Sequence, residues 1–374
     1  MIRLALILVM TVCGAALAQP QPRLTLDVPL TASAGFQFEP YASTASLAVA
    51  GDGSVFIVLK QVDASEKDAS EKKVRIDLLA LTRDGAQKFR VVVPATANRS
   101  TGSLKATVVP SGDVGVLHVF NDDGPGAMTS LYRFAPDGRL KKKSEIGPPS
   151  RRTGTPYGYY EIQHFQPTAD NAVMLSGGFG SGPYGWWLGK FSLDGVRIFQ
   201  SGPGQGFPEN VSAMAARPQG HWLALALEMD PKGMGLDWYL HRYTPAGQQQ
   251  SRVKVPAKGG YAAAILSDGG VVPLEDKLVF FNDLGRIVRE VPWPFANTTS
   301  IVPAGDGFWA VVSGAAVDTP NLIVRVDDRG KVLWRTPPVG DTPSIARASD
   351  GQLMAVLRSA DRATLRLVRY DDPP

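Results

Sequence analysis

Short stretches in which apolar and polar residues alternate recur along most of the chain, and each ends at a tight turn. The clearest copy runs from Leu131 to Phe134 and leads into Ala135-Pro136-Asp137-Gly138. Alternation with a period of two predicts a half-buried strand. Asp-Gly predicts a hairpin turn, because glycine takes a positive φ without strain and aspartate tolerates it. The pattern therefore predicts short antiparallel strands joined by hairpins.

Six copies of this stretch can be aligned on the glycine of the turn. These glycines are Gly85, Gly138, Gly195, Gly247, Gly285 and Gly330. Seven positions earlier each copy has an aliphatic residue: Leu78, Leu131, Leu188, Leu240, Leu278 and Ile323. Four positions earlier each has a second apolar residue: Leu81, Phe134, Phe191, Tyr243, Phe281 and Val326. Five positions earlier, four copies have a cation: Arg133, Lys190, Arg242 and Arg325. The repeat thus has a fixed register.

A second turn precedes each of these strands, as at Asp52-Gly53, so one unit is strand, tight turn, strand, variable loop, strand, tight turn, strand. Four antiparallel strands that recur roughly every 38 to 60 residues are typical of a β-propeller blade. Seven units begin near Ser46, Ser103, Tyr160, Asn210, Tyr261, Thr298 and Thr342. We therefore expect an all-β fold, a seven-bladed β-propeller of four-stranded antiparallel blades, in which residues 19–374 form a single domain.

The seventh unit lacks a fourth strand of its own. Its third strand, Leu365 to Tyr370, fits the repeat, and the sequence then ends on the turn at residues 371–374. Residues 23–28 form an unpaired strand candidate upstream of the first unit. We expect this N-terminal strand to complete the last blade and close the ring, because closure pairs an otherwise exposed edge.

This closure resembles that of WD40-like, NHL-like and quinoprotein-like propellers. The stretch from Asp327 to Trp334 also resembles the quinoprotein repeat, but it occurs once, and no copy has the Gly-His and Trp-Asp pair of WD40 units. The resemblance is to generic propellers and implies no particular family and no cofactor.

Residues 1–18 read as a signal peptide. Met1-Ile2-Arg3 is a positively charged start, an apolar run follows, and Ala16-Leu17-Ala18 suits cleavage between Ala18 and Gln19. The run is too short to span a bilayer, which takes about 20 apolar residues. The alternative is a lipoprotein anchored through Cys13, the only cysteine. We expect a periplasmic or secreted protein with no membrane insertion.

Charge and composition favour an ordinary globular protein. The chain has 39 Lys plus Arg and 35 Asp plus Glu, and 44% of its residues are hydrophobic. Such a mild positive excess gives little support for nucleic-acid binding. We expect a monomer without a nucleic-acid partner.

The connections opposite the tight turns are long and individual, and function concentrates on such loops. Three of them, residues 146–160, 176–185 and 201–209, converge on one sector around the third and fourth blades. Arginine offers a fork for carboxylates, and tyrosine offers a flat ring with a hydroxyl. The other interpretation is that the aromatic residues pack on their own loops and the arginines are solvated. The candidate ligand-binding residues are Arg151, Arg152, Tyr157, Tyr159, Phe179, Tyr184, Phe207 and Glu209, with His164 on an inner strand.

Signals for catalysis are weak. None of the four histidines has a partner at metal-ligand spacing, and there is no Gly-x-Ser-x-Gly motif. No cofactor and no metal site are predicted, although calcium coordination by Asp122, Asp123 or Asp230 stays open. The favoured function is therefore an exported, non-catalytic propeller that binds a protein, peptide or glycan on its loop-rich face. The alternatives are an enzyme with a site at the channel mouth (a metal-assisted hydrolase or lactonase, or a sugar oxidoreductase) and a structural role in envelope assembly.

Overall fold

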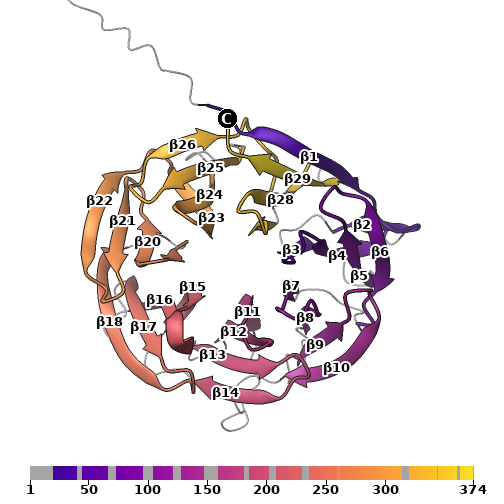
Figure 1. Cartoon of the computed structure of the whole chain (residues 1–374), viewed down its shortest axis with the longest axis horizontal. Helices are drawn as coiled ribbons and strands as arrows, with labels where there is room; N and C mark the ends of the chain where they lie inside the picture. The colour runs from indigo at the N-terminus through magenta and orange to yellow at the C-terminus, as the bar shows by residue number, and fades with distance from the viewer. Residues whose placement is uncertain are drawn as a thin grey trace, which may run out of the picture.

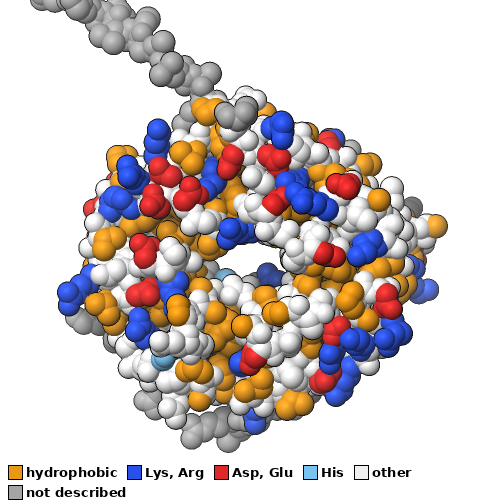
Figure 2. All heavy atoms as spheres, in the orientation of Figure 1, with side chains coloured by type: hydrophobic (Ala, Val, Ile, Leu, Met, Phe, Trp, Pro, Cys, Tyr) orange, Lys and Arg blue, Asp and Glu red, His pale blue; other side chains and the backbone are white. Residues whose placement is uncertain are grey.

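Seven antiparallel sheets stand radially around a central channel (Figures 1 and 2). The computed structural model describes residues 20–39, 44–65, 73–95, 104–120, 128–146, 159–180, 185–201, 208–229, 236–258, 260, 262–313, 320–342, 344–359 and 363–373. Each sheet is a blade of four strands, and the first blade has one additional short strand. The predicted fold class, an all-β seven-bladed propeller, is confirmed.

The strands are named here from the channel outward, blade 1 to blade 7. The inner strands are β3 (Ala45–Val49), β7 (Leu104–Val108), β11 (Tyr159–Pro167), β15 (Pro208–Ala216), β19 (Ala264–Leu266), β23 (Asn297–Ala304) and β27 (Ser344–Arg347). The second strands are β4 (Val55–Asp63), β8 (Val114–Phe120), β12 (Ala172–Gly180), β16 (Trp222–Met229), β20 (Gly269–Pro273), β24 (Gly307–Ser313) and β28 (Leu353–Arg358). The third strands are β5 (Val74–Leu81), β9 (Met128–Phe134), β13 (Gly185–Ser192), β17 (Leu236–Tyr243), β21 (Lys277–Asn282), β25 (Leu322–Asp327) and β29 (Leu365–Asp371). The outer strands are β6 (Gln87–Val92), β10 (Leu140–Ile146), β14 (Arg197–Ser201), β18 (Gln249–Lys258), β22 (Ile287–Pro292), β26 (Val332–Arg335) and, in blade 7, β1 (Arg23–Leu30).

Two shorter elements complete the described structure. Strand β2 (Phe36–Phe38) pairs with the far end of β4, beyond β3. A single turn of 3-10 helix (Pro218–Gly220) lies in the first hairpin of blade 4. Because successive strands are antiparallel, the tight turns all lie on one face of the ring, which we call the turn face. The remaining connections lie on the opposite face, which we call the loop face.

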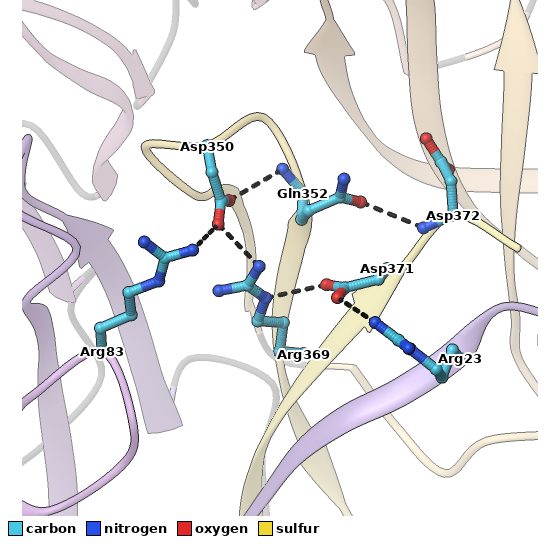
Figure 3. Close-up of polar contacts among 7 residues, drawn as sticks. All are labelled: Arg23, Arg83, Asp350, Gln352, Arg369, Asp371 and Asp372. Atoms are coloured by element: carbon cyan, nitrogen blue, oxygen red, sulfur yellow. Dashed lines mark hydrogen bonds and ion pairs between the residues drawn. The ribbon is translucent and has the colours of Figure 1, made fainter. Parts of the chain in front are cut away.

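The seventh blade is built from both ends of the sequence. β1 pairs antiparallel with β29, with Leu30 opposite Leu365 and Val28 opposite Leu367. This arrangement is consistent with the expected closure of the ring by the N-terminal strand. Figure 3 shows the polar contacts at this seam. Asp371 accepts hydrogen bonds from Arg23 on β1 at 3.5 Å and from Arg369 on β29 at 2.9 Å.

The same cluster ties blade 7 to blade 1. We call the tight turn between the inner and second strands of a blade its inner turn. Asp350, in the inner turn of blade 7, accepts hydrogen bonds from Arg369 at 2.6 Å and from Arg83 of blade 1 at 2.7 Å (Figure 3). Such exposed pairs contribute only about 0–1 kcal/mol each. The seam is held mainly by backbone pairing and by the apolar contacts described next.

Apolar side chains on the two faces of each sheet form seven clusters, one between each pair of neighbouring blades. Leu131 of blade 2 packs toward blade 3, while Phe134, three residues later, packs toward blade 1. The other five copies follow the same rule, and all twelve side chains at these two positions are at most 3% exposed. The repeat thus encodes contacts between blades.

In blades 1 to 6, the glycine of the tight turn between the third and outer strands lies against the outer strand of the preceding blade. A Cβ atom on Gly138 would come within 2.7 Å of the Phe89 ring on β6, and one on Gly247 would come still closer to the Phe199 ring on β14. The backbone is left-handed at both glycines, with φ of +88° and +79°. At the seam, a Cβ on Gly85 would lie 2.5 Å from Val28 of β1, so β1 takes the place of an ordinary outer strand. Glycine is needed for both its positive φ and its missing side chain.

Three of the four cations that recur before these turns form an ion pair with an acid of their own blade. Arg133 forms ion pairs with Asp113 of its own inner turn at 2.6 Å and with Asp194 of blade 3 at 3.0 Å. Lys190 pairs with Asp170 at 2.7 Å in the same way. Arg325 with Asp306 and Arg369 with Asp350 repeat the arrangement. The turn face is therefore a repeated lattice of acid–cation pairs.

Replacing Gly247 by alanine tests the packing of the turns. The left-handed backbone and the overlap with Phe199 should together lower the free energy of unfolding by about 2–5 kcal/mol. Gly51→Ala is the matched control, because a Cβ there meets no atom within 4 Å and its φ is not left-handed. Urea unfolding should separate the two variants, and equal midpoints would contradict this account.

Candidate functional site

The sector predicted from the loops is described only in part. Arg151, Arg152, Tyr157, Tyr184 and Phe207 lie outside the described residues, as do Asp122, Asp123 and Asp230.

The backbone places three other candidates at the loop-face ends of blades 3 and 4. Tyr159 is opposite Gly180 in the pairing of β11 with β12, one step from Phe179. Glu209 lies on β15, between Pro208, which is opposite Glu228, and the next paired residue. The structure thus brings these three backbone positions to neighbouring strand ends.

His164 belongs to the channel wall. It is half-buried on β11, and its Nε2 lies 2.8 Å from the carbonyl oxygen of Val211 on β15. Burial lowers the pKa of His164 to about 4, so the ring is neutral at pH 7. A carbonyl oxygen only accepts, and Nε2 therefore carries the proton.

The neighbouring residue completes the link between the two inner strands. Gln163 Oε1 accepts a hydrogen bond from the Val211 N–H at 2.9 Å. Serine side chains make the corresponding link elsewhere in the ring, from Ser46 to Ala106 and from Ser344 to Leu47. His164 and Gln163 therefore position the inner strand of blade 4 beside that of blade 3.

A group of ionisable side chains lies between blades 3 and 4, toward the loop face. The Glu228 carboxylate on β16 is 9% exposed and accepts a hydrogen bond from His241 Nε2 at 2.7 Å. Its other oxygen accepts two from Arg252, from Nη2 at 2.5 Å and from Nε at 3.2 Å. Charge-assisted hydrogen bonds of this kind offset the cost of burying a carboxylate.

The electrostatic balance at Glu228 favours the charged form. Burial raises the pKa of the carboxyl, but the hydrogen bonds from His241 and Arg252 and the positive charge of Arg252 outweigh it and hold the pKa below its usual range. Glu228 is a carboxylate at neutral pH, so His241 donates from Nε2. Its Nδ1 has no hydrogen-bond partner among the described residues.

Aromatic rings fix this group in place. The Trp186 ring of blade 3 meets the His241 ring edge-on, with centroids 4.9 Å apart, and the Tyr243 ring is stacked with the His241 ring at a centroid distance of 6.2 Å. The Arg252 guanidinium lies 3.5 Å from the centre of the Tyr239 ring. A cation over an aromatic face gains about 0.5–2 kcal/mol. The guanidinium is therefore pre-oriented, although its side chain is 45% exposed.

A second acid–base pair extends the group toward solvent. Asp237 is opposite Glu228 in the pairing of β16 with β17, and it accepts a hydrogen bond from Lys254 at 2.5 Å. Both acids are buried and both bases are about half exposed. The groups exposed here are therefore donors, the Arg252 guanidinium and the Lys254 ammonium, and the buried carboxylates balance their charge. Such donors suit hydroxyl, carbonyl or carboxylate oxygens, which accept hydrogen bonds.

These residues do not stand out in the sequence. Glu228 and His241 are 13 residues apart and lie in runs that read as ordinary buried strands. The one sequence signal that could have found this pair is a glutamate and a histidine placed on the same face of two neighbouring predicted strands. Within the described ranges, no three His, Cys, Asp or Glu side chains are grouped so that they could hold a metal ion. None of the helical segments described is long and apolar enough to cross a membrane.

The chain matches no protein-family model and no curated protein. Among solved structures it is similar to the Dos1 propeller, with 10% sequence identity over 92% of this chain and 95% of that chain and a TM-score of 0.53. It is also similar to the β-propeller domain of the Trilobed protease from Pyrococcus furiosus, with 11% identity over 89% of this chain and 95% of that chain and a TM-score of 0.52.

A third similar structure is the acylaminoacyl peptidase of Pyrococcus horikoshii. The identity is 13%, the match covers 88% of this chain and 52% of that chain, and the TM-score is 0.50. The shared feature is the propeller. At such low identities these comparisons show the fold alone, and they support the predicted resemblance to generic propellers without indicating a particular family.

Replacing Glu228 by glutamine tests the buried group through its pH dependence. The folded pKa of Glu228 lies below the unfolded value, so its contribution to stability is present above about pH 4.5 and is lost as the pH falls further. At pH 7 Glu228→Gln should be less stable by about 1–3 kcal/mol. Between pH 5 and pH 3 wild type should lose more stability than the variant, as measured by urea unfolding.

Glu145→Gln is the control, since this glutamate is exposed on β10. A Glu228→Gln profile parallel to wild type would show that the carboxylate is not held in its charged form.

Proposed function

We propose that this chain is an exported, non-catalytic β-propeller that binds a protein, peptide or glycan on its loop face, over blades 3 and 4. The observation that supports it most is the form of these two blades. Their inner strands β11 and β15 are the longest of the ring, with nine residues each against three to eight in the others. Among the inner strands, those of blades 3 and 4 therefore extend furthest toward the variable connections.

The two faces of the ring support the choice of side. The turn face is occupied by glycine turns and their ion pairs, which leave little freedom for variation. The connections of the loop face carry the aromatic and arginine residues of the predicted site, Arg151, Arg152, Tyr157 and Tyr184 among them. Rigid strands that present variable loops are a common basis for binding sites.

The chemistry of the described residues supports a polar ligand. Arg252 and Lys254 are about half exposed beside the loops, and the buried carboxylates of Glu228 and Asp237 balance their charge. Sugar hydroxyl and peptide carbonyl oxygens accept hydrogen bonds from such donors, whereas a phosphate would favour cations whose charge is not already balanced.

A test combines selection with two matched variants. Random peptide and glycan arrays probed with the purified protein should give ligands whose binding is lost in the variant with alanine at Arg151, Arg152, Tyr157 and Tyr184. The control variant has alanine at Arg139, Arg286 and Arg329, which are exposed on the turn face. Its binding should equal that of wild type.

Loss of binding in the control variant alone would contradict the assignment of the loop face. So would an absence of selected ligands from both arrays.

An enzyme is the second candidate, because Glu228 and His241 form a carboxylate–imidazole pair suited to proton transfer. Elemental analysis and an absorption spectrum of the purified protein distinguish the two. Stoichiometric calcium or a visible cofactor band favours the hydrolase or oxidoreductase, and their absence favours the binding protein.

The proposal that the protein is exported rests on residues 1–18. It requires that the mature protein begin at Gln19, which mass spectrometry of the purified protein would measure.

A further inference from the structure

The outer strands carry a large share of the positive charge of the molecule. Together the seven outer strands contain twelve Lys or Arg and three Asp or Glu. The whole chain has 39 and 35, so the residues outside these strands carry more acid than base. The rim of the disc is therefore basic, although the protein as a whole is close to neutral.

The longest run of cations lies at the outer strand of blade 2, which also carries Glu145. Arg139, Lys141, Lys142 and Lys143 follow one another with a single interruption, and all four side chains are exposed. Figure 2 shows Lys and Arg side chains gathered at this part of the rim, over β10. Lys141 is paired with Asp113 at 2.6 Å, and Lys143 lies over the Tyr132 ring. Arg139 and Lys142 form no ion pair with any described residue.

Exposed aliphatic side chains lie beside these cations. Leu140, within the basic stretch, is 39% exposed, and Val196 and Ile198 at the start of β14 are 62% and 52% exposed. The two segments are adjacent, because Ser144 of β10 donates a hydrogen bond to the carbonyl oxygen of Asp194, in the turn before β14, at 2.7 Å. We call the neighbouring stretches Arg139–Lys143 and Val196–Ile198 the rim patch.

We propose that the rim patch docks the propeller edge-on to an anionic membrane surface. Cations near anionic headgroups are attracted by about 1 kcal/mol each, and aliphatic side chains gain by entering the interface. A soluble anionic polymer would satisfy the cations, but it would leave the three aliphatic side chains in water. The combination of both kinds of residue favours the membrane.

The position of the patch makes this docking independent of the proposed ligand site. Arg139 and Val196 directly follow the turn glycines Gly138 and Gly195, so the patch lies at the turn-face edge of the rim. With the disc standing on its edge, the loop face would be roughly perpendicular to the bilayer and would stay open to solvent. Docking and ligand binding can therefore succeed or fail separately.

The test is co-sedimentation of the mature protein with vesicles of equal parts phosphatidylcholine and phosphatidylglycerol, in low salt. Arg139→Gln, Lys142→Gln and Lys143→Gln in one variant should lower partitioning about 100-fold, since each cation contributes roughly a factor of five. The matched control makes the same change at Arg329, Lys331 and Arg335, which are exposed at the rim of blade 6, where no large aliphatic side chain of the described residues is exposed. Its partitioning should stay within a few fold of wild type. Val196→Ser with Ile198→Ser should weaken binding without changing its dependence on salt.

Several outcomes would overturn the proposal. Equal losses in the two glutamine variants would mean diffuse attraction without a patch. Wild-type protein that ignores the vesicles but binds immobilised heparin through Arg139, Lys142 and Lys143 would point to a soluble polyanion. Unchanged binding in the Val196 and Ile198 variant would remove the argument for a membrane. Thermal melting of each variant verifies that it is folded.

Discussion

The burial of apolar side chains between neighbouring blades is the constraint on which the rest of this structure depends. A single four-stranded sheet has two faces, and in this ring each face is covered by the next sheet along. Leu131 and Phe134 illustrate the arrangement, since they lie three residues apart on one strand and pack toward opposite neighbours. A blade is therefore stable only with a partner on each side. The chain meets this requirement at the seam by placing β1 against β29, so that Leu30 and Leu365 join the cluster between blades 7 and 1.

The same constraint gives the two faces of the disc different structural roles. On the turn face, the contact of one blade's glycine with the preceding blade's outer strand leaves no room for a side chain, and the cations beside it pair with acids of neighbouring turns. Insertions there would separate the blades. On the loop face no such contact fixes the connections, so blades 3 and 4 can carry longer inner strands and a buried charged group. Glu228, His241 and Arg252 are held there by rings from both blades, a placement that only the interface between two sheets provides.

The sequence was sufficient to predict the fold because its information is local and repeated. Asp137-Gly138 and the apolar residues before it define one strand and one turn, and six aligned copies define the architecture. The contacts that these residues make are with residues far away in the sequence, and the local pattern does not predict them. Phe89 lies against Gly138 from another blade, and Arg133 reaches Asp194 across 61 positions. The site is harder still, because Glu228 and His241 occur once and obey no repeat. Of the predicted loop residues, the structure describes backbone positions for Tyr159, Phe179 and Glu209, and it assigns His164 a hydrogen bond in the channel wall.

The use of β1 as the last outer strand has a consequence for how the molecule is made. Arg23 and Asp371, which meet at the seam, are 348 positions apart. A ribosome produces β1 first, and the strand has no sheet to join until residues 365–371 have followed it. In the meantime blade 1 has no neighbour for the face that carries Leu79 and Leu81. The pairing of β1 with β29, and the cover that blade 7 gives to blade 1, therefore cannot form before the last strand of the ring has been synthesised.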